Sequence, residues 1–266
     1  MFWHLDRITN IGCRTPEQIK RSYKPRIFER SASVLNMIRQ IVGNFSWQKF
    51  VGSFLKNHQL ATVVPRNLYI ELEQVTARSE LFPKNISIEK IMNSWMMNNR
   101  VPELTVERRY NDNTINITQT QMDRDISAEG YFLWKMYKLG RLRDPNQTWI
   151  IPYNYAQESD ANFDGVGPIH WLAEPSTVIP TNATSNQWIL LSKRHSGLYR
   201  INYDEQNWKL LARALQSNIS CMPRENRAQL LSDAFYFHEK GQLNKSVLFE
   251  LLTFLSHETE SLVWQS

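Results

Sequence analysis

The stretch Gly197-Leu198-Tyr199-Arg200-Ile201-Asn202-Tyr203-Asp204 decides the fold of this 266-residue chain, because a predicted strand gives way to a helix at its end. Residues 198–203 predict the strand, and Asp204 is a residue type that favours a helix N-cap. Apolar residues then recur with a helical period, and the predicted buried stripe consists of Trp208, Leu211, Ala212 and Leu215. The chain is therefore expected to change from β to α structure at this point.

Upstream of Gly197 the sequence predicts several short strands. They cover residues 103–108, 114–119, 149–153 and 187–191. Asn111-Asp112-Asn113 is a hairpin signal between the first two, and Pro152 places the third at a sheet edge or strand end. Residues 156–167 are expected to form a long surface loop, and Ser196-Gly197 a turn. Short strands separated by turn signals indicate a small β-sandwich.

The first 100 residues are expected to be helical. A helix over residues 31–42 follows from the spacing of its apolar positions, which are Val34, Leu35, Ile38, Ile41 and Val42. Gly43 is expected to end it. Further helices are predicted around residues 50–55, 68–75 and 87–95, the last with Ser87 as half of a capping box.

Two more helices are predicted after residue 217. The first covers residues 225–240, with Ala228, Leu231, Ala234 and Phe235 on its buried side, and ends at Gly241. The second, around residues 247–255, is apolar almost all round, so it is expected to need packing partners on several sides.

Composition places the chain among globular proteins, with 42% hydrophobic and 21% charged residues. No window has the ~18 apolar residues of a membrane span, and residues 1–7 break too early for a secretory leader. The net charge is +5, and the N-terminal part is basic through Arg14, Lys20, Arg21, Lys24, Arg26 and Arg30. Without a nucleic-acid motif these residues are interpreted as a solvated helical face, and no nucleic-acid partner is expected.

The residue pattern predicts no catalytic metal. A zinc hydrolase needs two histidines one helical turn apart and a glutamate beside them, as in H-E-x-x-H. The six histidines are His4, His58, His170, His195, His238 and His257. His238-Glu239 and His257-Glu258 begin the motif, but Gln242 and Ser261 stand where its second histidine belongs. Both are expected to be surface or partly buried structural histidines.

Other catalytic patterns are missing as well. Glu258 and Glu260 are interpreted as paired surface acids rather than as a glycosidase couple. Cys13 and Cys221 form neither a C-x-x-C pair nor a disulfide framework. The sequence contains no G-x-S-x-G elbow and no glycine-rich phosphate loop.

N-x-S/T triplets are frequent, and their density indicates a secretory-pathway lineage. The possible glycosylation sites are Asn44, Asn85, Asn116, Asn146, Asn182, Asn218 and Asn244.

Three stretches, 32–38 (Ala32-Ser33-Val34-Leu35-Asn36-Met37-Ile38), 197–204 and 226–234 (Asn226-Arg227-Ala228-Gln229-Leu230-Leu231-Ser232-Asp233-Ala234), resemble landmarks of the zinc aminopeptidases of the aminopeptidase N and puromycin-sensitive type. Weaker similarities lie in matching order at 91–95, 101–106, 149–153 and 254–264, so the resemblance covers nearly the whole chain. Arg100 departs from the family's usual glycine at the junction.

The resemblance implies a multidomain α and β chain. Residues 1–100 would be the C-terminal helices of a thermolysin-like catalytic domain, 101–204 the β-sandwich, and 205–266 the start of a C-terminal helical superhelix. The family's zinc motif is absent from these residues. Phe28 occupies the position of the family's tyrosine, whose hydroxyl stabilises the tetrahedral intermediate, and is itself expected to be a core aromatic.

Three hypotheses follow. The first is a catalytically inactive member of this family without zinc, whose remaining role is to bind a peptide or a full-length paralogue. The second is an incomplete form of a membrane-bound or secreted zinc metalloaminopeptidase, with the triplets indicating an extracellular or plasma-membrane ectodomain. The third is an unrelated, non-enzymatic adaptor built from a sandwich and helices.

Overall fold

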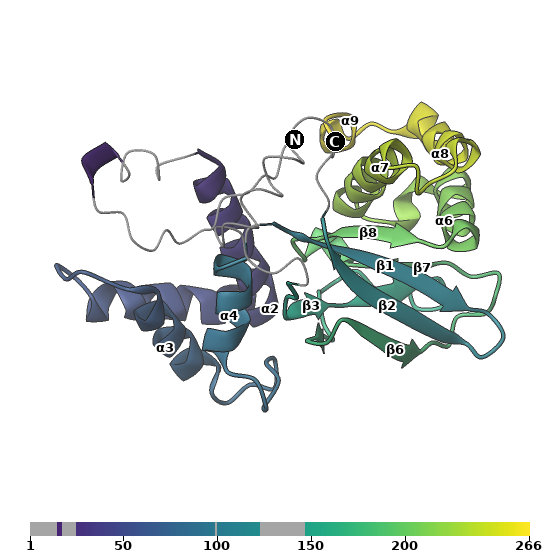
Figure 1. Cartoon of the computed structure of the whole chain (residues 1–266). Coiled ribbons are helices and arrows are strands. Elements are labelled where there is room, and N and C mark those ends of the chain that lie inside the picture. The colour runs from purple at the N-terminus through teal and green to yellow at the C-terminus, as the bar shows by residue number, and fades with distance from the viewer. Residues whose placement is uncertain (1–14, 18–24, 99, 123–146) are drawn as a thin grey trace, which may run out of the picture.

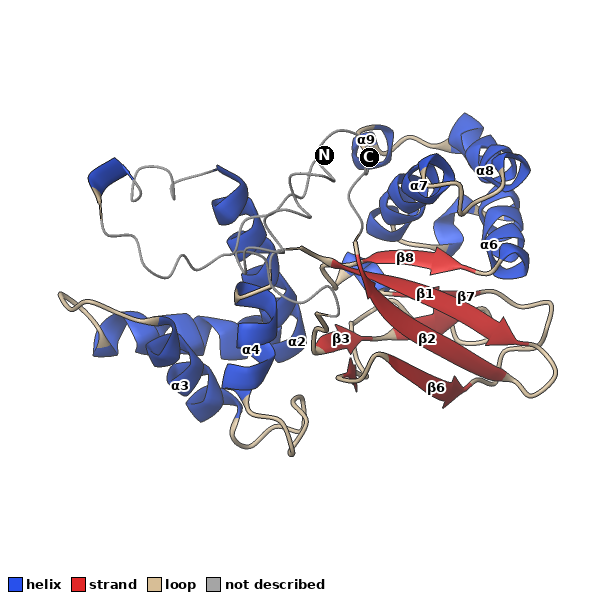
Figure 2. Ribbon diagram, viewed as in Figure 1, coloured by secondary structure: helices blue, strands red, loops and turns tan. Residues whose placement is uncertain are grey.

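The computed structural model describes residues 15–17, 25–98, 100–122 and 147–266. Helices form two groups, one at each end of the described chain, and the strands lie between them (Figures 1 and 2). The first group consists of α2 (Pro25–Asn57), α3 (Pro65–Thr76) and α4 (Ile88–Met96). The last group consists of α6 (Glu205–Ser217), α7 (Arg224–Glu239), α8 (Lys245–Leu252) and α9 (Ser261–Trp264).

Helix α2 contains the predicted stop at Gly43. Its ribbon continues through this residue, but Gly43 has φ 79° and ψ 159°, so two helical segments meet there at a kink. A φ in this range suits glycine, which has no Cβ to oppose it. The predicted end of the first helix is therefore a kink, and the segment predicted around residues 50–55 continues beyond it.

The main sheet has four strands in the order β6-β2-β1-β8. These are β1 (Pro102–Arg109), β2 (Thr114–Gln121), β6 (Ser176–Pro180) and β8 (Arg200–Tyr203). β1 and β2 form the predicted antiparallel hairpin, with Asn113 at φ 52° in its turn. β8 runs parallel to β1, with Leu104 opposite Ile201.

Two small two-stranded sheets complete the β region. They pair β3 (Ile151–Tyr153) with β5 (His170–Leu172) and β4 (Tyr155–Gln157) with β7 (Ile189–Leu191). The predicted turn at Ser196-Gly197 thus lies between strands of different sheets and follows a 3-10 turn, η1 (Lys193–His195). The stretch predicted as a long surface loop begins inside β4, where Ala156 is only 3% exposed.

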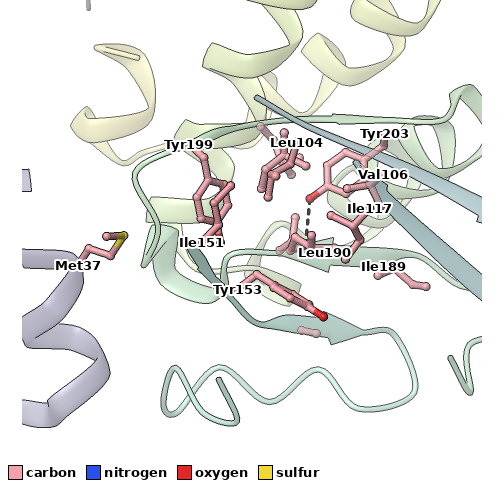
Figure 3. Packing of buried hydrophobic residues seen from close by; sticks show 14 of the residues in the cluster. Met37, Leu104, Val106, Ile117, Ile151, Tyr153, Ile189, Leu190, Tyr199 and Tyr203 are labelled. Carbon is pink, nitrogen blue, oxygen red and sulfur yellow. Dashed lines mark hydrogen bonds between the residues drawn. The ribbon is translucent and has the colours of Figure 1, made fainter. Parts of the chain in front are cut away.

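The core lies between the main sheet and the small strands. Leu104, Val106 and Ile117 point toward Ile151 and Ile189 in Figure 3, and all five are buried. Tyr203 spans the two layers, since its hydroxyl oxygen accepts a hydrogen bond of 3.0 Å from the backbone N–H of Leu191. The fold is thus a mixture of α and β structure with small sheets.

Helix α4 connects the first helical group to the strands. Trp95 is fully buried, and its indole N–H donates to the carbonyl oxygen of Ile150 at 3.0 Å. Ser94 accepts from the backbone N–H of Ile150 at 3.1 Å. Ser87 caps the helix by accepting from the N–H of Lys90, as predicted.

Arg30 on α2 is buried rather than solvated, which corrects the interpretation of the basic stretch at this residue. Its guanidinium donates to the carbonyl oxygens of Trp95 and Arg100 at 3.2 and 2.7 Å. A long cationic side chain can be buried when backbone carbonyls at a helix end accept its N–H groups. Arg14, Lys20, Arg21 and Lys24, together with His4 and Cys13, lie outside the described residues. Arg26 is part of α2, but its side chain is not described.

The C-terminal helices follow their sequence signals with one exception. Asp204 caps α6 by accepting from the N–H of Asn207 at 2.9 Å, and the predicted apolar stripe is buried. Phe235 on α7 was predicted to be buried, but 42% of it is exposed. Adjacent helical residues differ by about 100° in direction, so when Ala234 turns inward its neighbour turns away.

Candidate functional site

Two of the landmark stretches meet at one contact, between β8 and α7. Arg200 Nη1 lies 2.8 Å from Asp233 Oδ1, and both side chains are largely buried. The other carboxylate oxygen of Asp233 accepts from the backbone N–H of Ile201 at 3.0 Å. Arg200 also donates to the carbonyl oxygen of Ser232 at 3.2 Å. The carboxylate therefore binds both the side chain and the backbone of the strand, which fixes the helix against the sheet.

A second ion pair borders this contact and joins the same helix to β1. Lys240 Nζ lies 3.0 Å from a carboxylate oxygen of Glu103. The hydroxyl of Tyr236 donates a hydrogen bond to the carboxylate of Glu103. The guanidinium of Arg200 stacks on the ring of Tyr236, 4.5 Å from the ring centre. The arrangement crosslinks β1, β8 and α7 by charge and aromatic contact.

Burial raises the pKa of Asp233 to about 6, even though Arg200 and the bond from Ile201 act in the opposite direction. A carboxyl group with such a pKa in a cleft would suggest acid–base chemistry. Asp233 is only 3% exposed, and its oxygens already bond to the neighbouring strand. It is therefore a structural group.

Asn226, at the start of the third landmark, holds the turn η1. Its side-chain oxygen accepts from the N–H of Arg194, and its amide donates to the carbonyl of Ser192, both at 2.7 Å. Ser192, Arg194 and His195 all have left-handed φ values between 51° and 63°. Such conformations are unusual for residues other than glycine and persist where surrounding contacts over-determine them.

Arg227 and Glu258 form a buried pair, which corrects the interpretation of Glu258 as a surface acid. The guanidinium donates at 2.6 and 3.0 Å to the two carboxylate oxygens. Although burial opposes it, bonds from Arg227 and from the N–H groups of Glu260 and Thr259 lower the pKa of Glu258. The acid follows η3 (Thr253–His257) and fixes that segment to α7.

Phe28 lies in the first helical group, and the structure corrects its expected burial. It is 58% exposed on α2, whose Val34, Met37 and Ile38 are buried. Met37 is nine positions further along, which at about 100° per residue places it on the opposite side of the helix. The side facing away from the core therefore includes Phe28.

The described histidines do not form a metal site. His238 is partly buried with Nδ1 3.0 Å from the carbonyl oxygen of Leu243, and His257 is exposed. Glu258, next to His257, forms an ion pair with Arg227. Within the described residues no group of three or more histidine, cysteine, aspartate or glutamate side chains could hold a metal ion. The side chains present do not fit the zinc centre that the family resemblance implies.

Most candidate glycosylation sites are accessible. Asn44, Asn85, Asn182, Asn218 and Asn244 are exposed, and Asn116 is half-buried on β2. Asn218 and Asn244 also cap helical turns by accepting from the N–H groups of Ser220 and Ser246. Asn146 lies outside the described residues.

Arg108 is an organising residue that the sequence did not reveal. It is 8% exposed and donates to the carbonyl oxygens of Ala183, Thr184 and Gln187. Its guanidinium also lies 4.6 Å from the centre of the Tyr110 ring, and Tyr110 bonds to the cap residue Asp204. The alternation of strand β1 predicts only that position 108 is polar. It does not predict that Arg108 binds the carbonyl oxygens of the loop at residues 183–187.

Comparisons with known proteins match the parts of the chain that contain the landmark stretches. A model of the peptidase family M1 domain matches residues 5–95, and a model of the ERAP1-like C-terminal domain matches residues 188–266. Aminopeptidase N of Rattus norvegicus is 28% identical over 253 residues, which are 95% of this chain and 24% of that protein. Membrane alanyl aminopeptidase of Heliothis virescens is 24% identical, over 97% of this chain and 24% of that protein.

The two matched models lie in this order along the chain, which agrees with the resemblance to the zinc aminopeptidases. The chain resembles the zinc aminopeptidases of peptidase family M1, and aminopeptidase N is among the proteins similar to it. It spans about a quarter of the length of the curated relatives it matches. These similarities argue against the hypothesis of an unrelated adaptor.

Proposed function

We propose that this chain is a catalytically inactive part of an aminopeptidase-type fold whose role is binding, of a peptide or of a full-length paralogue. The observation that carries the proposal is the place of Phe28. A residue that serves a substrate has to face outward from its helix, and Phe28 does so with 58% of its surface exposed. Its phenyl ring has no hydroxyl to stabilise an oxyanion.

The position of Phe28 also supports the alignment that assigns it to the family's tyrosine. If the ring were buried in the core, packing alone would explain a phenylalanine at this position. The 58% exposure of Phe28 is consistent with the assignment, because a substrate-facing tyrosine would also need an accessible side chain. The same outward face supports binding, because it offers apolar surface to a peptide.

The proposed layout follows the resemblance: residues 1–100 as the C-terminal helices of the catalytic domain, 101–204 as a β-sandwich and 205–266 as the start of the helical superhelix. The M1 model ends at residue 95, just before β1 begins at Pro102. The C-terminal model begins at residue 188, so it includes β7 and β8 as well as the helices.

A second candidate function is that the chain is part of a longer membrane-bound or secreted zinc metalloaminopeptidase. Seven of the twelve large apolar side chains that are exposed among the described residues lie on α2, on α3 or between these two helices. They are Phe28, Phe45, Leu55, Leu60, Val63, Val64 and Ile70. A surface of this kind marks an interaction with further protein. Where the structure describes the chain, no helix is long and apolar enough to cross a membrane.

The test is a zinc and activity measurement on the purified chain. We expect no tightly held zinc by elemental analysis and no release of N-terminal residues from a set of aminoacyl anilides and short peptides, with or without added zinc. Peptide or paralogue binding would be measured by calorimetry. One bound zinc per chain together with peptide hydrolysis would contradict the proposal.

A further inference from the structure

Strand β6 leaves one edge of the main sheet open. Its register with β2 places Thr177 opposite Ile117 and Ile179 opposite Ile115. Hydrogen bonds from Gln119 N–H to Pro175 O and from Thr181 N–H to Asn113 O continue the same alternation. The backbone groups of Ser176 and Val178 therefore point away from β2.

This edge has the features of a strand that could pair with another chain. Figure 2 shows β6 as the outermost strand of the sheet. Val178 is 50% exposed at its centre. Pro180 has no N–H to offer, which protects one end only, so the donors of Ser176 and Val178 stay available. An exposed edge with an apolar centre is a template for edge-to-edge association.

Two of the glycosylation triplets flank this edge. Asn116 lies directly opposite Val178 in the register, so the two side chains project from the same face of the sheet. Asn182 is exposed two residues beyond the end of β6. A sugar on either side chain would occupy the space next to the open strand.

We infer that N-linked glycans on Asn116 and Asn182 cover the open edge of β6 and prevent its pairing with a second chain. This inference rests on the second candidate function, in which the chain is part of a membrane-bound or secreted protein. The sugar comes from an activated donor, a lipid-linked oligosaccharide pyrophosphate: the bond from its first sugar carbon to the pyrophosphate oxygen breaks, that carbon bonds to the side-chain Nδ2, and the lipid pyrophosphate leaves. Nδ2 loses one hydrogen as a proton and keeps the other. Asn116 Nδ2 lies 3.5 Å from Glu107 Oε2, so the remaining N–H can still donate to that carboxylate.

The test begins with the full chain produced in the secretory pathway of cultured cells. Mass spectrometry of glycopeptides is expected to find sugar on Asn116 and Asn182. The double variant Thr118→Val and Thr184→Val removes both triplets but leaves both asparagines in place. Thr118→Val also keeps a β-branched residue in the strand. Asn85→Gln, which removes an exposed triplet between α3 and α4, is the matched control.

Sedimentation and amide hydrogen exchange then report on the edge. Without the two glycans, the apparent dissociation constant for self-association is expected to fall by about tenfold or more, since strand addition uses the two free donors. The amides of Ser176 and Val178 should become protected at the same time. Adding Val178→Lys should reverse both changes, because a lysine on an edge strand opposes pairing. The Asn85→Gln control should show neither change.

Two results would overturn the inference: no sugar on Asn116 and Asn182, or unchanged association and exchange once both triplets are removed. Sugar on Asn85, Asn218 or Asn244 alone would overturn the inference and leave the second candidate function, part of a membrane-bound or secreted protein, standing. No sugar at any of these asparagines would count against both.

Discussion

Arg200 on β8 and Asp233 on α7 are 33 positions apart in the sequence and 2.8 Å apart in space. Each belongs to a different landmark stretch, and their contact joins the two stretches in space. The side chain of Arg200 reaches Asp233 from the strand, and the carboxylate of Asp233 also accepts a hydrogen bond from the backbone N–H of Ile201 in the same strand. The two landmark stretches thus attach helix α7 to strand β8.

Replacing Asp233 with asparagine should destabilise the chain by about 1–3 kcal/mol, because the single amide oxygen cannot accept from both Arg200 and the N–H of Ile201, so one buried donor loses its partner. The free energy of unfolding, measured by denaturant titration, checks this. Glu80→Gln is the control, since the Glu80–Lys84 pair is almost fully exposed. That variant should unfold as the natural chain does. Equal stability of the two variants would contradict the structural role of the buried pair.

The pKa of Asp233 predicts an unusual pH dependence. Its folded value of about 6 lies above the ordinary value of 3.8, so the folded chain holds this proton more tightly than the unfolded chain. The contribution of Asp233 to the free energy of unfolding should therefore rise as pH falls through 6, and level off below the unfolded pKa.

The measurement is the difference in unfolding free energy between the natural chain and Asp233→Asn across that pH range. Taking the difference removes Glu258 and Glu71, whose lowered pKa values act in the opposite direction and weaken the fold in acid. Carbon NMR of the Asp233 carboxyl should show a midpoint near 6. A midpoint near 3.8 would show that Arg200 and the bond from Ile201 fully offset burial.

Gly197→Ala tests the close packing at the start of β8. A Cβ at this position would lie 2.0 Å from a ring atom of Tyr199, which is buried. The ring has to move, and overpacking of this kind costs about 1–3 kcal/mol. Gly165→Ala is the control, because its added Cβ would meet nothing within 4 Å. Thermal unfolding should separate the two variants, and a Gly197→Ala protein as stable as Gly165→Ala would show that the ring is not held there.

Local signals predicted the elements whose causes are local. The β1–β2 hairpin follows from Asn111-Asp112-Asn113, and α6 follows from Asp204 and its apolar period. These features depend on residues within a few positions of one another. The same reasoning correctly predicted the helices α3 and α4.

The wrong predictions concern side chains whose burial or pairing depends on residues far away in the sequence. Phe28 and Phe235 have the size and character of core residues, but their exposure is decided by which side of the helix meets the rest of the chain. Glu258 looked like a surface acid because Arg227 is 31 positions away. Arg108 gave no signal, since the carbonyls that it binds lie 75 to 79 positions further along. Of the candidate site, sequence reasoning identified the landmark stretches and not the contacts between them.

Phe28→Tyr tests whether this position is the family's oxyanion donor. In a longer form of the protein that contains a zinc motif, restoring the hydroxyl should raise kcat by about 10²–10³ with little change in KM, because the donor acts on the transition state. The stability of the present chain should not change, since the ring is exposed. Phe45→Tyr, also exposed on α2, is the control and should leave the rate unchanged. If Phe28→Tyr has no more effect on kcat than this control, Phe28 does not stand in the place of the catalytic tyrosine.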